Sequence, residues 1–159
     1  MSDPIALRII EAMKARLEAI TTTPGPGIDP FHTDAGERVY LGRRTLDADE
    51  VALVIFSGLE TGGDSSHPKL AAELAVHIEG QHPLANRDDG EQIGQRLIAD
   101  IQRAAEIQGD RTLGGLAFRF VKYTGRALAY PPDGAALVHV RVSYSIGYHR
   151  EYGAPEKTR

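Results

Sequence analysis

The stretch Val51-Ala52-Leu53-Val54-Ile55-Phe56 decides the fold that this sequence predicts. It is an unbroken apolar run, too short for a helix and too rich in β-branched residues for a loop, between the acidic cluster 47–50 and Ser57-Gly58. A strand with one exposed face alternates apolar and polar residues, whereas a strand covered on both faces does not. We therefore expect 51–56 to be a central strand, with other strands beside it and helices over at least one face.

Two amphipathic helices are predicted, one before this strand and one after it. The first is expected to begin with Asp3 as the N-cap and Pro4 at the first helical position. The second is expected to run from 88–90 to 109–110, and Gly94 within it indicates close packing, since glycine costs about 1 kcal/mol relative to alanine there. Apolar residues recur at helical spacing in both: Ile5, Ile9, Met13, Leu17 and Ile20 in the first, and Ile93, Leu97, Ile101 and Ala104 in the second.

Alternation of apolar and polar residues predicts further strands. The two clearest lie at 70–79 and 138–148, and another is expected at 116–123. A short strand at 38–41 is expected to pair with 51–56 as a hairpin.

Clusters of glycine and proline separate these elements. They predict loops at 24–37 and 57–68, the second of them mobile, and the polar tail 153–159 is expected to be loose. Because short turns favour antiparallel pairing, we expect an α+β fold, in which two helices pack on a mostly antiparallel sheet of about five strands with a long C-terminal hairpin. One domain is expected to span 1–159. Such a sheet has two edges to cover or pair, and assembly with further copies is one way to do so.

Composition narrows the classes of function. The formal net charge is −4, so no basic excess indicates a nucleic-acid partner. The sequence has no cysteine, which excludes disulfides, thiolate nucleophiles and zinc–cysteine sites. No apolar run approaches the ~18–20 residues that a membrane-spanning helix needs. We therefore expect a soluble intracellular protein with no membrane association.

One candidate for metal chemistry is the group His77, Glu79 and His82. The zinc-protease pattern is His-Glu-x-x-His on a helix, where both imidazoles share a face. Here the order differs and the segment is predicted to be a strand, so a solvated strand end is favoured. A small metal-dependent hydrolase centred on these residues stays open as an alternative. No serine lies in a Gly-x-Ser-x-Gly motif, and the sequence predicts no catalytic, metal-binding or cofactor-binding residue.

Several stretches, taken in order, carry a resemblance to a known family. They are the opening helix, RVYLGRRTL at 38–46, GEQIGQRLIADI at 90–101, LGGL at 113–116, YTGR at 123–126 and the final valine-rich strand. Together they resemble the tail terminator (tail-completion, minor tail protein U-like) proteins of long-tailed bacteriophages. The resemblance spans about residues 5 to 153, and that family is similar in its order of elements, with an α+β fold.

The resemblance implies a structural virion protein of a phage or prophage, and neither an enzyme nor a cofactor. Such proteins form a ring, expected here to be a hexamer, that caps the tail tube, stops its polymerisation and joins the tail to the head. The implied partners are further copies of the chain, the tail-tube protein and the head–tail connector, with DNA passing through without specific binding. The implied location is the virion tail, and the host cytoplasm during assembly. Another ring-forming neck, connector or tail-tube protein is an alternative.

Four cations are candidates for the ring lumen or a contact between subunits, because they would place positive charge on the last part of the sheet. Ordinary exposed cations are the alternative explanation for each of them. The four are Arg119, Lys122, Arg126 and Arg141.

Overall fold

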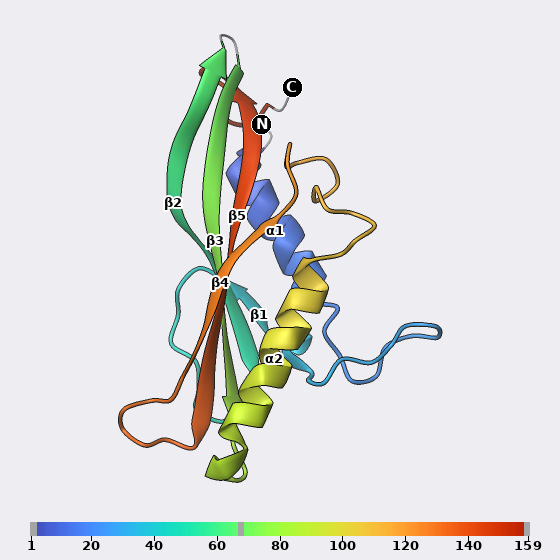
Figure 1. The fold of residues 1–159 in the computed structure, drawn as a ribbon, viewed down its shortest axis with the longest axis vertical. Helices are drawn as coiled ribbons and strands as arrows, with labels where there is room; N and C mark the ends of the chain where they lie inside the picture. Colours follow the sequence, from blue (N-terminus) through green and yellow to red (C-terminus); the bar gives the residue numbers. More distant parts are fainter. Residues whose placement is uncertain (1–2, 67–68, 158–159) are drawn as a thin grey trace.

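The computed structural model describes residues 3–66 and 69–157, and it has the predicted α+β class. Five strands form one mixed sheet in the order β1-β2-β3-β5-β4, and two α-helices lie against one face of it (Figure 1). Along the chain the elements are α1 (Ile5–Leu17), a 3-10 turn η1 (Ala35–Glu37), β1 (Val39–Leu41), β2 (Ala52–Ser66), β3 (Lys69–Pro83), η2 (Arg87–Asp89), α2 (Gly90–Ala105), β4 (Lys122–Ala129) and β5 (Leu137–Glu151).

The main core lies between the helices and the inner face of the sheet. The predicted stripe of α1 is fully buried, and so are Leu97 and Ile101 of α2. Alternate apolar residues of β3 and β5 lie on the inner face of the sheet. The two strands pair along their whole length, so the strands predicted at 70–79 and 138–148 are both confirmed. Gly94 is buried beneath β4, where an added Cβ would overlap Leu128 Cδ1, so its predicted close packing is confirmed. The inner residues of β3 and β5 are Ala72, Leu74, Val76, Ile78, Val138, Val140, Val142, Tyr144, Ile146 and Tyr148.

Helix α1 begins one residue later than predicted, and Asp3 is not its cap. Pro4 occupies the N-cap position with an extended backbone (φ −54°, ψ 143°) and without a side-chain cap. The N–H of Ile5 instead donates to the Pro155 carbonyl at 3.0 Å. The C-terminal segment therefore satisfies one of the N–H groups that the first turn of the helix leaves without an intrahelical partner. In contrast to the loose tail predicted, 153–157 is attached to the body by this bond and by Glu151 N to Lys157 O at 3.1 Å, while 158–159 lie outside the described residues.

The expected hairpin of 38–41 with 51–56 is wrong, because β1 pairs with β2 in parallel. Parallel neighbours need a crossover connection, and here it spans 42–51 on the face of the sheet away from the helices (Figure 1). The Gln81 amide holds the crossover by donating to the carbonyls of Asp47 at 2.6 Å and Glu50 at 3.2 Å. The crossover also explains why 51–56 has no polar face: helices cover its inner side and this segment lies over its outer side.

The mobile loop expected at 57–68 is also wrong as far as Ser66, because β2 continues to that residue in antiparallel register with β3. The register shifts between Ser57 and Glu60 and again between Gly62 and Ser65. Glycine is typical of such bulges. The glycines of 57–66, which predicted a loop, therefore belong to a bulged strand. Residues 67–68 lie outside the described chain.

The strand expected at 116–123 is displaced toward the C-terminus. The structure has turns over 111–116 and irregular backbone as far as Phe120, and β4 begins only at Lys122. Positive φ angles at Leu113 (53°), Gly114 (67°) and Gly115 (87°) belong to the turns immediately before the expected strand. Antiparallel pairing of β4 with β5 gives the predicted C-terminal hairpin.

The loop expected at 24–37 contains no regular structure apart from η1, and its second half is fixed to α2. The carboxylate of the buried Asp100 accepts bonds from the backbone N–H of His32 at 3.0 Å and of Thr33 at 2.8 Å. The Arg103 guanidinium lies over the Phe31 ring and donates to the Pro30 carbonyl. These contacts bury Thr33, Ala35 and Gly36, whereas 25–30 in the first part of the loop are exposed.

Candidate interaction surfaces

The four cations proposed from the sequence lie in three different places. Lys122 and Arg141 share the outer face of the sheet, opposite the helices, since their strand partners Ser145 and Glu79 lie on that face. Arg126 is on the inner side of the edge strand and donates to Gln95 of α2 at 2.8 Å. Arg119 belongs to the segment before β4. The structure therefore does not gather the four cations into one cluster.

Arg141 is part of a polar cluster on the outer face of β2, β3 and β5. Arg141 pairs with Glu79, and in the next row His77 Nδ1 lies 2.8 Å from Ser143 Oγ. The His77 ring contacts Phe56 with 5.4 Å between ring centroids. Burial lowers the pKa of His77, the Arg141 charge lowers it further, and Glu79 opposes both, so the ring is neutral at pH 7.

The structure does not gather His77, Glu79 and His82 into a metal site. The first two share the outer face, whereas His82 has the opposite parity and its Nδ1 lies 2.6 Å from the Pro83 carbonyl. Among the described residues no group of three or more His, Cys, Asp or Glu side chains is placed to hold a metal ion. His77, Glu79 and His82 therefore do not form one common site in the structure.

A surface that the sequence did not predict is formed by 111–121, here called the aromatic loop. Phe120 is 59% exposed and Phe118 is 39% exposed. An arginine lies over each ring, Arg111 at 5.0 Å from the Phe120 centroid and Arg119 at 5.1 Å from the Phe118 centroid. Exposed aromatic and arginine side chains are the types enriched at the centres of protein interfaces. An open apolar depression lies along Phe118, Phe120 and Lys122.

Phe118 is held against strand β5 of the sheet. Its ring stacks on the His149 ring with 4.1 Å between centroids, and it covers Gly147, where an added Cβ would lie 2.8 Å from the ring. The Phe118 N–H donates to the Gly147 carbonyl at 3.0 Å, which makes it a short extension of the sheet beside β5. These contacts with β5 fix the position of the aromatic loop.

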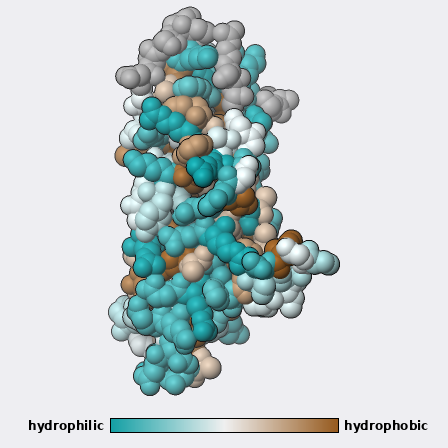
Figure 2. Space-filling model, turned by 45° about the vertical axis from the view of Figure 1, so that its right-hand side comes forward, coloured by the Kyte–Doolittle hydropathy of each residue, from teal (hydrophilic) through white to brown (hydrophobic). Residues whose placement is uncertain are grey.

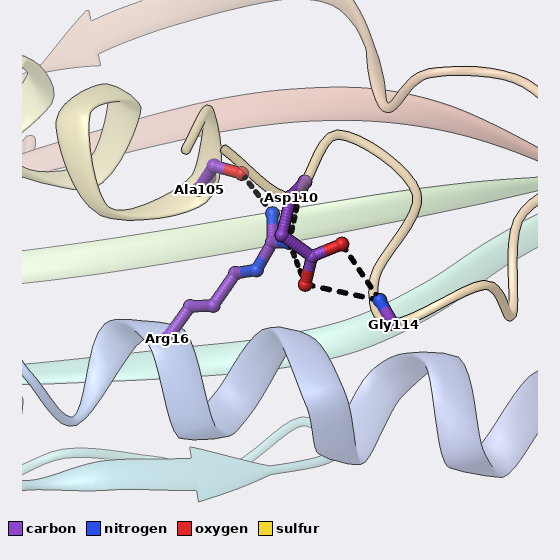
Figure 3. A network of polar contacts seen from close by, with 4 residues as sticks. All are labelled: Arg16, Ala105, Asp110 and Gly114. Carbon is purple, nitrogen blue, oxygen red and sulfur yellow. Dashed lines mark hydrogen bonds and ion pairs between the residues drawn. The ribbon is translucent and has the colours of Figure 1, made fainter. Parts of the chain in front are cut away.

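A buried arginine fixes the base of the aromatic loop (Figure 3). Arg16 of α1 donates to the Ala105 carbonyl at 2.8 Å and to the Asp110 carbonyl, and its guanidinium lies 3.0 Å from Asp110 Oδ2. The Asp110 carboxylate also accepts the Gly114 N–H at 2.8 and 3.0 Å. The bond from Gly114 is the main cause that lowers the pKa of Asp110; desolvation opposes it, and the hydrogen bond and charge of Arg16 lower the pKa further. One side chain of α1 thus bonds both to the end of α2 and to the base of the loop.

Both edges of the sheet are open. The parallel strand β1 covers β2 only from Leu53 to Ile55, so no described strand lies beyond β2 over 57–66. At the other end of the strand order, no described strand lies beyond β4. Open edges are sites for pairing with another chain unless they are covered or blocked.

The described residues on the face shown in Figure 2 form no single large apolar patch. Figure 2 shows the side of the molecule that carries the helices. Small hydrophobic patches are scattered there among hydrophilic side chains, and one of them lies on the segment that projects from the body. That segment belongs to the loop 24–37, where Ile28 is 58% exposed. No helix in the described part of the chain is long and apolar enough to span a membrane.

Comparison of the sequence with protein-family models and with curated proteins found no match.

Proposed function

We propose that this protein is a structural subunit of a bacteriophage tail. Copies of it assemble into a ring that caps the tail tube, ends its polymerisation and joins the tail to the head. The resemblance to tail terminators over about residues 5 to 153 supports this proposal. The observation that carries it furthest is that the sheet is open at both edges, over 57–66 of β2 and along β4.

Open edges at opposite ends of one sheet favour assembly in a ring. The edge of β2 and the edge of β4 are different surfaces, so a contact between them is head-to-tail and repeats until the rotation closes. Pairing also satisfies backbone N–H and C=O groups that the isolated chain leaves to water.

The aromatic loop supports a role in recognition of proteins. Phe118 and Phe120 present apolar area on a backbone that is already held by Gly147 and by the Arg16–Asp110 pair. A surface that is ordered before binding loses little conformational entropy when a partner covers it.

The test is the mass of the protein in solution, measured by light scattering over a wide range of concentration, with electron microscopy of the same samples. The proposal expects closed rings, and six copies of a 17.2 kDa chain give about 103 kDa. A chain that stays monomeric throughout, or that forms only a compact dimer, would contradict it.

A second measurement separates a terminator from a tube protein. Purified tail-tube protein is allowed to polymerise with and without the chain, and tube lengths are compared. A terminator shortens the tubes and is found only at their ends, whereas a tube protein extends them and is found along their length.

A further inference from the structure

The sequence contains two Asp-Gly dipeptides, and the structure gives them different surroundings. Asp89-Gly90 begins α2, and Asp133-Gly134 lies in the connection between β4 and β5. The start of α2 and this connection are at the same end of the molecule (Figure 1). In an Asp-Gly dipeptide the aspartate reacts readily with its own backbone, because the glycine has no side chain to hinder the nitrogen that follows the aspartate.

The reaction is a ring closure that needs only water. The glycine nitrogen attacks Cγ of the protonated aspartate carboxyl group, a C–N bond forms, the nitrogen loses its proton and one carboxyl oxygen leaves as water. Water then adds to either carbonyl of the resulting succinimide and breaks the C–N bond at that carbonyl. One product is aspartate again, and the other is isoaspartate, in which the main chain runs through the former side chain.

Ring closure requires a backbone that can rotate at the aspartate. The Cα–C bond must turn until the next nitrogen lies against the side-chain carboxyl carbon, so the hydrogen bonds of both residues have to open first. Local opening in a folded protein ranges from almost no cost in exposed turns to the full free energy of unfolding in the core. The surroundings of each dipeptide therefore decide how fast it reacts.

The turn at Asp133 opposes the rotation only weakly. Asp133 and Gly134 are both exposed. The Gly134 N–H donates to the Pro131 carbonyl at 3.2 Å, and the Ala135 N–H donates to Asp133 Oδ1 at 3.0 Å. Water can replace both bonds at little net cost, because they lie at the surface. Apart from the adjacent residues, no described atom lies within 4 Å of the position that a Cβ on Gly134 would take, so this backbone has room to move.

The start of α2 holds the other dipeptide in place. Asp89 is the N-cap of α2, with φ −86° and ψ −2°, and Gly90 is buried. The Asp89 N–H donates to the Asn86 carbonyl at 3.1 Å, and the Gly90 N–H donates to the Arg87 carbonyl. The Tyr130 ring covers Gly90, where an added Cβ would lie 2.5 Å from Cε1 of the tyrosine. Rotation at Asp89 would unwind the first turn of the helix and displace this ring.

We infer that Asp133 is a site of spontaneous succinimide and isoaspartate formation, and that the fold protects Asp89 from the same reaction. Isoaspartate at 133 adds one methylene group to the main chain of the β4–β5 connection and removes the carboxylate that accepts the Ala135 N–H. The inference does not depend on the proposed ring.

The experiment ages the natural chain and examines both sites. The protein is kept at neutral pH and physiological temperature for several weeks and then digested, and electron-transfer fragmentation of the peptides distinguishes isoaspartate from aspartate. The rate of isoaspartate formation at 133 is expected to exceed the rate at 89 by about tenfold or more, because the start of the helix costs more to open than the turn.

Controls separate the effect of the fold from the effect of local sequence. In guanidinium chloride both dipeptides lose their structure, and their rates are expected to become similar. Tyr130→Ala uncovers Gly90 and is expected to raise the rate at 89 in the folded protein, with thermal unfolding to show that the variant is folded. Asp133→Ser cannot form the ring and is expected to lack the product at 133.

The outcomes decide both parts of the inference. If no isoaspartate forms at 133 in the time that the denatured chain needs to form it, or if the two sites react equally fast in the folded chain, the inference is wrong. A rate at 89 that is as slow in denaturant as in the folded protein would show that the fold is not what protects it. If Tyr130→Ala does not fold, the comparison of the folded and denatured natural chain still decides.

Discussion

Arg16 of helix α1 and Asp110 at the base of the aromatic loop form an ion pair, with 3.0 Å between Nη2 and Oδ2, across 94 residues of sequence. The same guanidinium satisfies two backbone carbonyls, those of Ala105 and Asp110. One buried side chain therefore holds the C-terminal end of α2 and the start of the loop in a fixed position relative to α1.

Replacement of Arg16 by methionine is expected to destabilise the protein by about 2–4 kcal/mol, because it removes the ion pair and leaves the Ala105 carbonyl buried without a donor. Urea unfolding measures the change. Lys14→Met is the control, since its pair with Glu18 is partly exposed and worth about 0.5 kcal/mol or less. Equal effects of the two substitutions would contradict the structural role assigned to Arg16.

The aromatic loop is expected to loosen in acid. The Gly114 N–H and Arg16 hold the pKa of Asp110 below its ordinary value of 3.8, so the bonds persist above that value and are lost as the pH falls through the lower pKa of the folded state. Amide exchange at Gly114, followed from pH 5 to pH 2 and corrected for intrinsic rates, is expected to lose protection. In Asp110→Asn the protection should be weaker at pH 5 and should change less on acidification.

His77 is expected to make the protein less stable below neutral pH. Its pKa in the folded state is lowered by burial, so stability is unaffected above the ordinary value of 6.5 and declines as the pH falls below it, because the unfolded chain binds the proton more tightly. Chemical unfolding at pH 7.5, 6.5 and 5.5 would measure the decline. His77→Gln should have a smaller decline than the natural chain, and an unchanged profile would show that other groups are responsible.

Gly94→Ala is expected to destabilise the protein by about 1–3 kcal/mol, since the added methyl group overlaps Leu128 and overpacking exceeds the gain in helix propensity. Gly109→Ala is the matched control, as nothing lies within 4 Å of the position its Cβ would take. Thermal or urea unfolding of both variants decides the matter. If Gly94→Ala were as stable as the natural chain, Leu128 and β4 would have to shift to accommodate the methyl group without a measurable cost in stability.

A chain without cysteine allows the proposed contact between copies to be trapped. The double variant Leu59→Cys, Phe120→Cys places one thiol at each open edge, and mild oxidation is expected to give a ladder of disulfide-linked dimers, trimers and larger species that stops at the size of the ring. Each single variant can give dimers at most. Denaturing gels without reductant read the result, and a double variant that gives no product beyond dimers would contradict the head-to-tail contact.

Elements whose signal is local could be predicted from the sequence. The uninterrupted run 51–56 and the alternation at 138–148 identify buried and half-buried strands without knowledge of their neighbours. The pairing of β1 depends on a distant residue, because Gln81 holds the crossover that makes β1 parallel to β2. Short-range patterns contain no information about that bond.

The candidate surface was predicted only in part, for a similar reason. Arg119 and Lys122 were predicted as charges on the last part of the sheet, but 116–123 was predicted to be one strand, whereas the backbone is irregular as far as Phe120. The exposure of Phe118 and Phe120 follows from the turns at Gly114-Gly115, which the Arg16–Asp110 pair holds in place. The glycine pair was a signal against a continuous strand, whereas the partner of Asp110 was beyond prediction from the sequence.

The bond from Ile5 to the Pro155 carbonyl has a practical consequence for labelling. It places the beginning and the end of the described chain side by side, at the same end of the molecule as the last residues of β2 and the first residues of β3 (Figure 1). A fluorophore or affinity tag joined to either terminus would lie at that end of the molecule. The opposite end, where α2 begins and where the β4–β5 connection turns, would keep its natural surface with either tag.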